Sequence, residues 1–177
     1  FATVGLVTQI EGGAFGVEGN KASAEPVRVG KGVLVGDRIW VERASVLRIT
    51  DTQGGRITVA GPAAVEFMKR DRSQVSVKIF KGSVKFNASE HQPIHFENAF
   101  LSGTVKGEGA LWASDNKAQV LGLAGEVQTW HPHLEKAVVK VHPGFFAESA
   151  MALKYLQPRK PVRANTQQFQ EFLSRFD

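Results

Sequence analysis

The stretch Val77-Lys78-Ile79-Phe80-Lys81-Gly82-Ser83-Val84-Lys85-Phe86 carries the pattern that decides the fold. On either side of Gly82, side chains suited to a core alternate with side chains that face outward, as in half-buried β-strands. Glycine has no Cβ and tolerates a positive φ, so a strand can bend there at little steric cost. The stretch therefore predicts two short strands that meet at a corner.

Glycines recur through the middle of the chain at nearly even intervals, roughly 21 residues apart. They are Gly61, Gly82, Gly103, Gly125 and Gly144, and most of them follow a short apolar run and precede another. Bends at one period stack or wrap strands around a shared apolar centre. We therefore expect an all-β fold of short strands, either solenoid-like as in a β-helix or a twisted sandwich. The glycines expected to form structural turns are Gly61, Gly82, Gly125 and Gly144.

A further structural turn is expected at Gly36-Asp37, which follows the apolar run Val33-Leu34-Val35. Glycine supplies an unusual φ, and the Asp37 carboxylate can accept main-chain N–H groups just beyond it. The pair therefore has a structural explanation that requires no catalytic role.

The composition suits a folded chain of one domain, or one domain with a small appendage, since 42% of the 177 residues are apolar. No apolar run approaches the roughly 18 residues that would span a bilayer, so this fragment is not expected to be transmembrane. The absence of cysteine excludes disulfides, thiolate chemistry and cysteine-ligated metals. The sequence begins at Phe1 without an initiator methionine, so we expect a processed product from which a signal or anchor segment has been removed.

The net charge of +5 and the calculated pI near 9.6 would permit contact with acidic partners. The basic clusters at residues 69–72 and 159–163 are not interleaved with aromatic residues, which a base-stacking surface would need. We therefore expect no nucleic-acid partner.

From residue 145 the period of the apolar residues changes to that of helices. Residues 145–156 place their apolar side chains on one side of a helix, and the prolines at 158 and 161 predict a linker over residues 157–163. A last helix is expected after Asn165, which offers an N-cap oxygen. We therefore divide the chain into an all-β domain at 1–144 and a C-terminal helical extension of one or two short helices at 145–177.

The last helix carries an apolar stripe at positions i, i+3, i+4 and i+7, namely Phe169, Phe172, Leu173 and Phe176. The stripe can dock on the chain's own body, where it would cap the open end of the β stack, or it can insert into a groove of another protein. These four residues are the candidate partner-binding residues.

The run Gly36-Asp37-Arg38-Ile39, followed by residues 44–51 and 56–67, resembles the core of the FecR domain. Strand-glycine-strand units at 77–86 and 120–127 continue the likeness, which covers roughly residues 4–144. The resemblance implies a non-catalytic, all-β module of the bacterial periplasm, known in regulators that relay the state of an outer-membrane transporter to a sigma factor. The sequence shows no anti-sigma helices and no membrane segment. A stand-alone or differently coupled module is therefore expected.

Motifs for chemistry are absent from the sequence. There is no Gly-x-Ser-x-Gly elbow and no phosphate-cradling glycine loop. His131 and His133 bracket Pro132, and no acidic residue stands at an obvious ligand spacing, which favours a polar loop over a metal site. We therefore expect no enzyme activity, no metal and no cofactor.

The tryptophans offer a second candidate binding surface. Trp40, Trp112 and Trp130, together with Phe100, could line a shallow carbohydrate or peptide groove, because large rings contribute broad contact area while a polar edge stays wet. The alternative is that they fill the core, and we expect at most one of the three to be exposed for binding.

These observations support two hypotheses about function. The first is a periplasmic or otherwise extracytoplasmic binding and signalling module that recognises a protein or a cell-envelope component, through a sheet edge or the C-terminal helix. The alternative is a structural protein of the cell envelope whose rigid β body acts as a scaffold, alone or as an oligomer.

Overall fold

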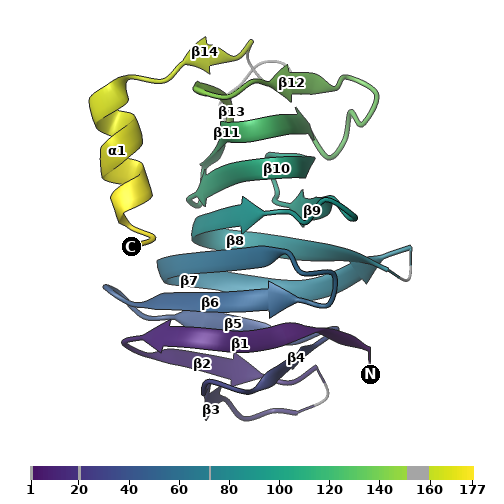
Figure 1. Cartoon of the computed structure of the whole chain (residues 1–177), viewed down its shortest axis with the longest axis vertical. Coiled ribbons are helices and arrows are strands. Elements are labelled where there is room, and N and C mark those ends of the chain that lie inside the picture. The colour runs from purple at the N-terminus through teal and green to yellow at the C-terminus, as the bar shows by residue number, and fades with distance from the viewer. Residues whose placement is uncertain (1, 20, 72, 151–159) are drawn as a thin grey trace.

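The computed structural model describes residues 2–19, 21–71, 73–150 and 160–177. These residues confirm the all-β prediction, because they form one 14-stranded sheet and a single short C-terminal helix (Figure 1). The elements are β1 (Thr3–Glu11), β2 (Ala14–Val17), β3 (Glu25–Pro26), β4 (Gly32–Leu34), β5 (Arg38–Val41), β6 (Val46–Asp51), β7 (Arg56–Arg70), β8 (Gln74–Asn87), β9 (Ile94–Glu97), β10 (Ser102–Ala113), β11 (Lys117–Trp130), β12 (Val139–Val141), β13 (Phe145–Ala150), β14 (Val162–Arg163) and α1 (Thr166–Ser174).

The longest strands belong to two layers. The first part of β7 pairs with β6 and its second part with β5. In the same way, the two parts of β8 pair with β9 and β10, those of β10 with β9 and β8, and those of β11 with β13 and β12. We call layer A the sheet made of β4, β1, β6, residues 56–60, 83–87, 108–113 and 117–121, β13 and β14. Layer B consists of β3, β2, β5, residues 63–70 and 74–81, β9, residues 102–105 and 127–130, and β12.

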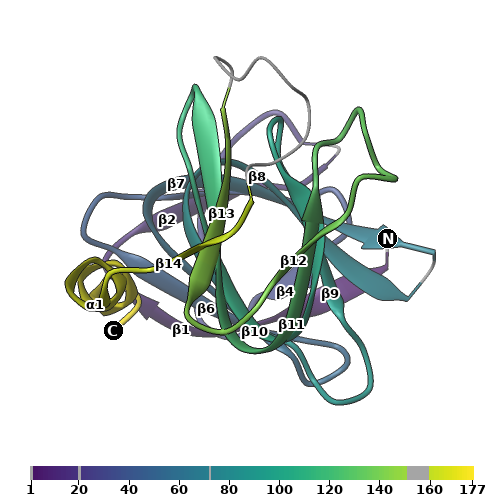
Figure 2. The same cartoon turned by 90° about the horizontal axis from the view of Figure 1, so that it is seen from above.

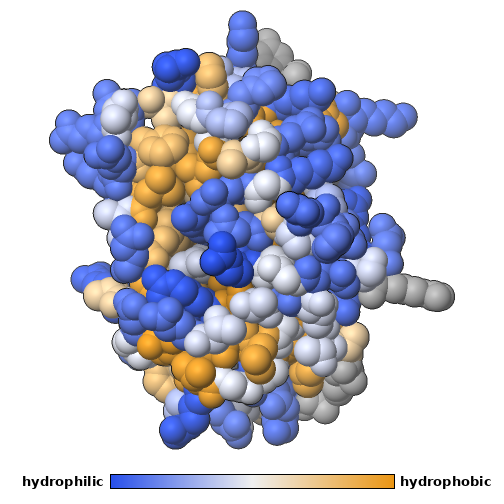
Figure 3. Space-filling model, in the orientation of Figure 1, coloured by the Kyte–Doolittle hydropathy of each residue, from blue (hydrophilic) through white to orange (hydrophobic). Residues whose placement is uncertain are grey.

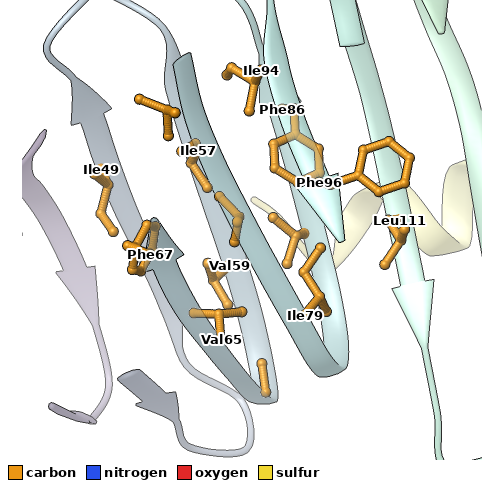
Figure 4. Packing of buried hydrophobic residues seen from close by; sticks show 14 of the residues in the cluster. Ile49, Ile57, Val59, Val65, Phe67, Ile79, Phe86, Ile94, Phe96 and Leu111 are labelled. Carbon is orange, nitrogen blue, oxygen red and sulfur yellow. The ribbon is translucent and has the colours of Figure 1, made fainter. Parts of the chain in front are cut away.

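The inward side chains of both layers form one core. Ile57 and Val59 from layer A meet Val65 and Phe67 from layer B, and all four are at most 1% exposed. Figure 4 shows these side chains, with others from β6 and β8 to β10, pointing into the same interior. Figure 2, which looks along the stack, shows the strands surrounding this interior and α1 lying outside it.

The bends between the layers coincide with glycines. Gly61, Gly82 and Gly125 lie inside β7, β8 and β11, where these strands pass from one layer to the other, and Gly144 lies between β12 and β13. Gly82 has a φ of +108°, and Gly125, with a φ of +68°, pairs with Gly107 on β10. At Gly61 a Cβ would overlap the carbonyl oxygen of Glu42. Glycine is therefore favoured by main-chain contact at Gly61, by φ at Gly144, and by both at Gly82 and Gly125.

The turn at Gly36-Asp37 joins β4 to β5 and is tied to the end of β7. Gly36 has a φ of +94°, and its N–H donates to the carbonyl oxygen of Phe67 over 2.8 Å. The buried Asp37 carboxylate accepts the N–H of Leu34 at 2.9 Å. The sequence predicts that this carboxylate accepts N–H groups of residues that follow Asp37, and that prediction is wrong. The N–H donor precedes Asp37, because the turn closes backward onto β4.

The helix predicted over residues 145–156 is wrong for its first half. Residues 145–150 form β13, which pairs antiparallel with β11, and Ala147 and Ser149 alternate inward. The apolar residues at 145 and 146 fit either period, and the sheet edge offered by β11 decides in favour of a strand. Residues 151–156 of that helix, and 157–159 of the predicted linker, lie outside the described residues. The division of the chain at residue 144 stays a prediction, and the sheet continues across that point.

The glycine bends generate a test of the architecture. In Gly82→Ala the new Cβ would collide with Ala63 and lie 2.9 Å from the carbonyl oxygen of Pro62, at an unfavourable φ. We expect the free energy of unfolding, measured by denaturant titration, to fall by about 3 kcal/mol. Gly144→Ala is the matched control, because Gly144 has a φ of +85° but open space around it, so that only about 1 kcal/mol should be lost. Equal losses would contradict the claim that packing at the bend matters.

Candidate functional site

A large hollow lies on the outer face of layer B. We call it the outer groove. It has a volume of about 890 Å³, its floor is formed by outward side chains of β8 to β11, and loops near residues 98–100 and 132–135 form its rim. Lys78, Phe80, His95, Glu97, Phe100 and Trp130 line it.

Strand alternation places these side chains on the outside. On β8, Val77 and Ile79 enter the core, so Lys78 and Phe80 point outward. Phe80 is 45% exposed, which is unusual for a ring of this size. The Lys78 ammonium lies 5.3 Å from the centroid of the Phe80 ring, a favourable cation–π arrangement.

Charges alternate across the strands beside the groove. Arg38 pairs with Glu66, Glu66 with Lys78, and Lys78 with Glu97 in the register of β5, β7, β8 and β9. Arg38 Nε donates to Glu66 Oε1 at 2.6 Å. Opposite charges on neighbouring strands attract one another, and the register places those of this row side by side along the groove.

His95 lies at the floor of the groove and is only 3% exposed. Its Nδ1 is 2.8 Å from Ser76 Oγ, its register partner on β8, and its ring lies 6.1 Å from that of Trp130. Burial, with a smaller effect from the Arg70 charge, lowers the pKa of His95 to about 4. The imidazole is therefore neutral at pH 7, and no group among the described residues hydrogen-bonds its Nε2.

The three tryptophans do not share one surface. Trp130 lines the outer groove together with Phe100, as the interpretation of these residues as groove-lining predicts. Trp112 lies on the outer face of layer A, with Lys117 Nζ 5.4 Å from its ring centroid. Trp40 is 42% exposed on β5, directly opposite Phe15 on β2. The outer groove therefore joins Trp130 to Phe100, and a smaller pocket beside α1 joins Trp112 to Phe169 and Phe172.

The histidines after β11 form a local polar turn. The His133 N–H donates to Nδ1 of His131 at 3.1 Å, and the two rings lie 5.4 Å apart. Burial, and less strongly the neighbouring His133, lowers the pKa of His131. No set of three or more His, Cys, Asp or Glu side chains suited to a metal ion occurs in the part of the chain that the structure describes.

The structure places the four candidate partner-binding residues against the chain's own sheet. Asn165 Oδ1 caps α1 by accepting the N–H of Gln167 at 3.0 Å. The helix then crosses the strands on the outer face of layer A, and a band of apolar atoms lies beside it (Figure 3). With a rise of about 1.5 Å per residue and strands about 4.8 Å apart, its nine residues cover about three strands. The expected cap over the end of the stack is therefore wrong, because α1 lies along the side.

One side chain does most of the docking. Phe176 is 4% exposed and packs on Ala60 and Ala110, whereas Phe169, Phe172 and Leu173 stay half-buried. The Phe172 and Phe176 rings meet edge to face at 5.5 Å, and Arg48 Nη2 donates to the carbonyl oxygen of Phe176 at 2.7 Å. Whether the stripe also binds a partner stays a prediction.

The fold resembles two crystal structures of a candidate anti-sigma factor from Parabacteroides distasonis ATCC 8503. The structure at 1.65 Å resolution aligns with a TM-score of 0.62 at 15% sequence identity, over 77% of this chain and 64% of that one. The structure at 2.50 Å resolution aligns with a TM-score of 0.62 at 16% sequence identity, over 77% of this chain and 63% of that one. The chain thus spans slightly less than two thirds of these neighbours, and at this identity the likeness shows a shared fold. Neither a protein-family model nor a curated protein sequence matches the chain.

The docking of α1 can be tested by hydrogen exchange. Phe176→Ala removes the buried side chain that holds the helix to layer A, so amide protection over residues 166–174 should fall at least about tenfold while β7 and β8 stay protected. Gln170→Ala, at an exposed position of the same helix, is the control and should leave protection unchanged. Unaltered protection in Phe176→Ala would show that other contacts hold the helix.

The buried imidazole predicts a pH effect on stability. The pKa of His95 is lowered in the folded state, so between about pH 6.5 and pH 4 the unfolded chain binds a proton that the folded chain does not, and acidification through this range destabilises the fold. A shift of this size corresponds to about 3 kcal/mol at most, and partial solvent contact reduces it to roughly 2 kcal/mol. In His95→Gln the free energy of unfolding should fall less between pH 7 and pH 4.5 than in the wild type. Parallel pH profiles would refute the assignment.

Proposed function

We propose that this chain is a non-catalytic binding and signalling module of the bacterial periplasm, which recognises a protein or an envelope component through the outer groove. The observation that carries the proposal is the groove itself: an open hollow that presents Phe80, Phe100 and Trp130 beside charged side chains. Phe80 is 45% exposed and the other two rings are partly buried, and partly exposed aromatic rings beside charged groups are typical of recognition surfaces.

The geometry of the groove argues against hydrolysis. Ser76, His95 and Glu97 are the residue types of a catalytic triad, but Ser76 Oγ and Glu97 Oε1 both approach the same ring nitrogen, Nδ1, at 2.8 and 3.9 Å. A nucleophile and an orienting carboxylate must bind opposite nitrogens of the imidazole for a proton to be passed along. Ser76 is also buried, with only 2% of its surface exposed. The trio therefore packs as a structural cluster.

A signalling role is supported by two independent likenesses. The neighbours found by fold are crystal structures of a candidate anti-sigma factor, and the sequence runs at 36–39, 44–51 and 56–67 resemble the FecR domain of periplasmic regulators. No helix among the described residues is long and apolar enough to cross a membrane. We therefore propose that any relay across the membrane depends on another protein or on another part of a longer chain.

Site-specific photo-crosslinking in intact cells tests the proposal. A photoreactive amino acid at position 80 should form a discrete adduct with a component outside the cytoplasm, because this side chain projects from the groove wall. Position 53, in the exposed turn between β6 and β7, is the matched control and should form none.

A second readout addresses signalling. Phe80→Asp, introduced on the chromosome, should abolish the adduct formed from a photoreactive residue at position 100 and should change the transcription of a defined set of genes. The folded state is checked by its thermal transition. Adducts only with cytoplasmic proteins, or equal adducts from positions 80 and 53, would refute the proposal.

A further inference from the structure

The outer groove has a floor whose main chain is already fully engaged in the sheet. β8 pairs with β7 on one side and with β9 and β10 on the other, β9 lies between β8 and β10, and β11 pairs with β10, β12 and β13. A ligand lying there cannot extend a strand ladder, as a bound peptide does at a sheet edge. An extended peptide would have to leave its own N–H and C=O groups without main-chain partners, which costs free energy. A ligand on the floor of the groove would therefore meet side chains and not an open strand edge.

The charges in the groove nearly balance. Its lining includes two cations, Arg70 and Lys78, and three carboxylates, Glu97, Asp115 and Glu135. The chain as a whole has a net charge of +5, so the groove differs from the surface around it. A polyanion would meet the carboxylates and a polycation would meet Arg70 and Lys78. This distribution favours a ligand without net charge.

The apolar and polar parts of the groove are separated in a way that suits a sugar ring. Phe80, Phe100 and Trp130 line the groove, with Phe80 45% exposed and the other two partly buried, and their accessible ring surface can cover the C–H side of a pyranose and remove apolar area from water. In the same groove, beside Trp130, Nε2 of His95 has no hydrogen-bond partner among the described residues. Ser76 engages Nδ1 and thereby holds the ring in place, so Nε2 stays available to a hydroxyl group. The volume, about 890 Å³, suits a small ligand of several rings.

We propose that the outer groove binds an uncharged oligosaccharide, with Phe80, Phe100 and Trp130 against the ring faces and His95 Nε2 hydrogen-bonded to a hydroxyl. The inference rests on the proposed function and narrows it, since it names the chemical class of the envelope component. In this groove aromatic side chains lie together with a ring nitrogen that has no hydrogen-bond partner among the described residues and belongs to a residue only 3% exposed.

Calorimetric and NMR titrations of the purified chain test the inference. The probes are N-acetylchitotriose, cellotriose and maltotriose, each up to about 10 mM, which is ten times the dissociation constant of a weak, about 1 mM complex. At least one should bind, and it should shift the indole resonance of Trp130 but not that of Trp40. Failure of all three to bind would overturn the inference.

Variants locate the site. Trp130→Ala and Phe80→Ala should each weaken binding at least about tenfold, and His95→Gln should weaken it several-fold while Ser76 keeps a hydrogen-bond partner. Trp40→Ala is the matched control, because it removes an exposed tryptophan of the same layer outside the groove and should leave affinity unchanged. NMR spectra of the free variants establish that each is folded. Equal affinity of the Trp130 and Trp40 variants would place the sugar elsewhere and refute the inference.

The crosslinking experiment separates this inference from the function on which it rests. A protein adduct at position 80 that persists under saturating oligosaccharide would show that the groove binds a protein, so the sugar inference would fall while the binding module would stand. Loss of every specific adduct at position 80, with the titrations also negative, would remove both.

Discussion

The structure depends on close approach of main chain to main chain at the bends of its long strands. At Gly61 the position of a Cβ is taken by the backbone of Glu42, and at Gly82 it is taken by Ala63. A larger residue would push apart the strands that these bends hold together, and with them the two layers of the core. Because β7 and β8 supply both layers, the outer groove and the surface under α1 depend on the same few contacts.

Much of the sheet was predictable because its signals are local. Alternation in residues 75–86 marks the strands, and glycine marks their bends whatever the tertiary partners are. The error at residues 145–150 has the opposite origin. Phe145 and Phe146 suit a helix or a strand equally, and the choice is made by pairing with β11, which is distant information. Local sequence pattern therefore predicts a strand less well where pairing with a neighbouring strand, and not the residues of the segment itself, determines the structure.

The outer groove could not be predicted from the sequence, because the register of strand pairing brings its residues together. Ser76 and His95 are 19 residues apart and meet only through the parallel pairing of β8 with β9, in a sheet otherwise dominated by antiparallel neighbours. Residue type identifies Trp130 and Phe100 as binding candidates, whereas strand alternation predicts only that Phe80 points outward. The Phe stripe of α1 was equally visible in the sequence, yet its helical period could not say which surface it would cover. Residue type and period identify candidates, and topology decides which of them meet.

The sharing of strands between layers also limits how such a chain can evolve. Side chains alternate from face to face, so an inserted or deleted residue on one side of Gly82 would exchange the inner and outer faces of that half of β8 alone. The apolar faces of the two halves of β8 would then no longer both point into the core. We therefore expect changes in length to fall in the connections, such as the segments after β2 and β11, and not in the paired halves of the long strands. Diversity among related chains should accumulate at the rims of the stack, while the long strands keep a constant number of residues.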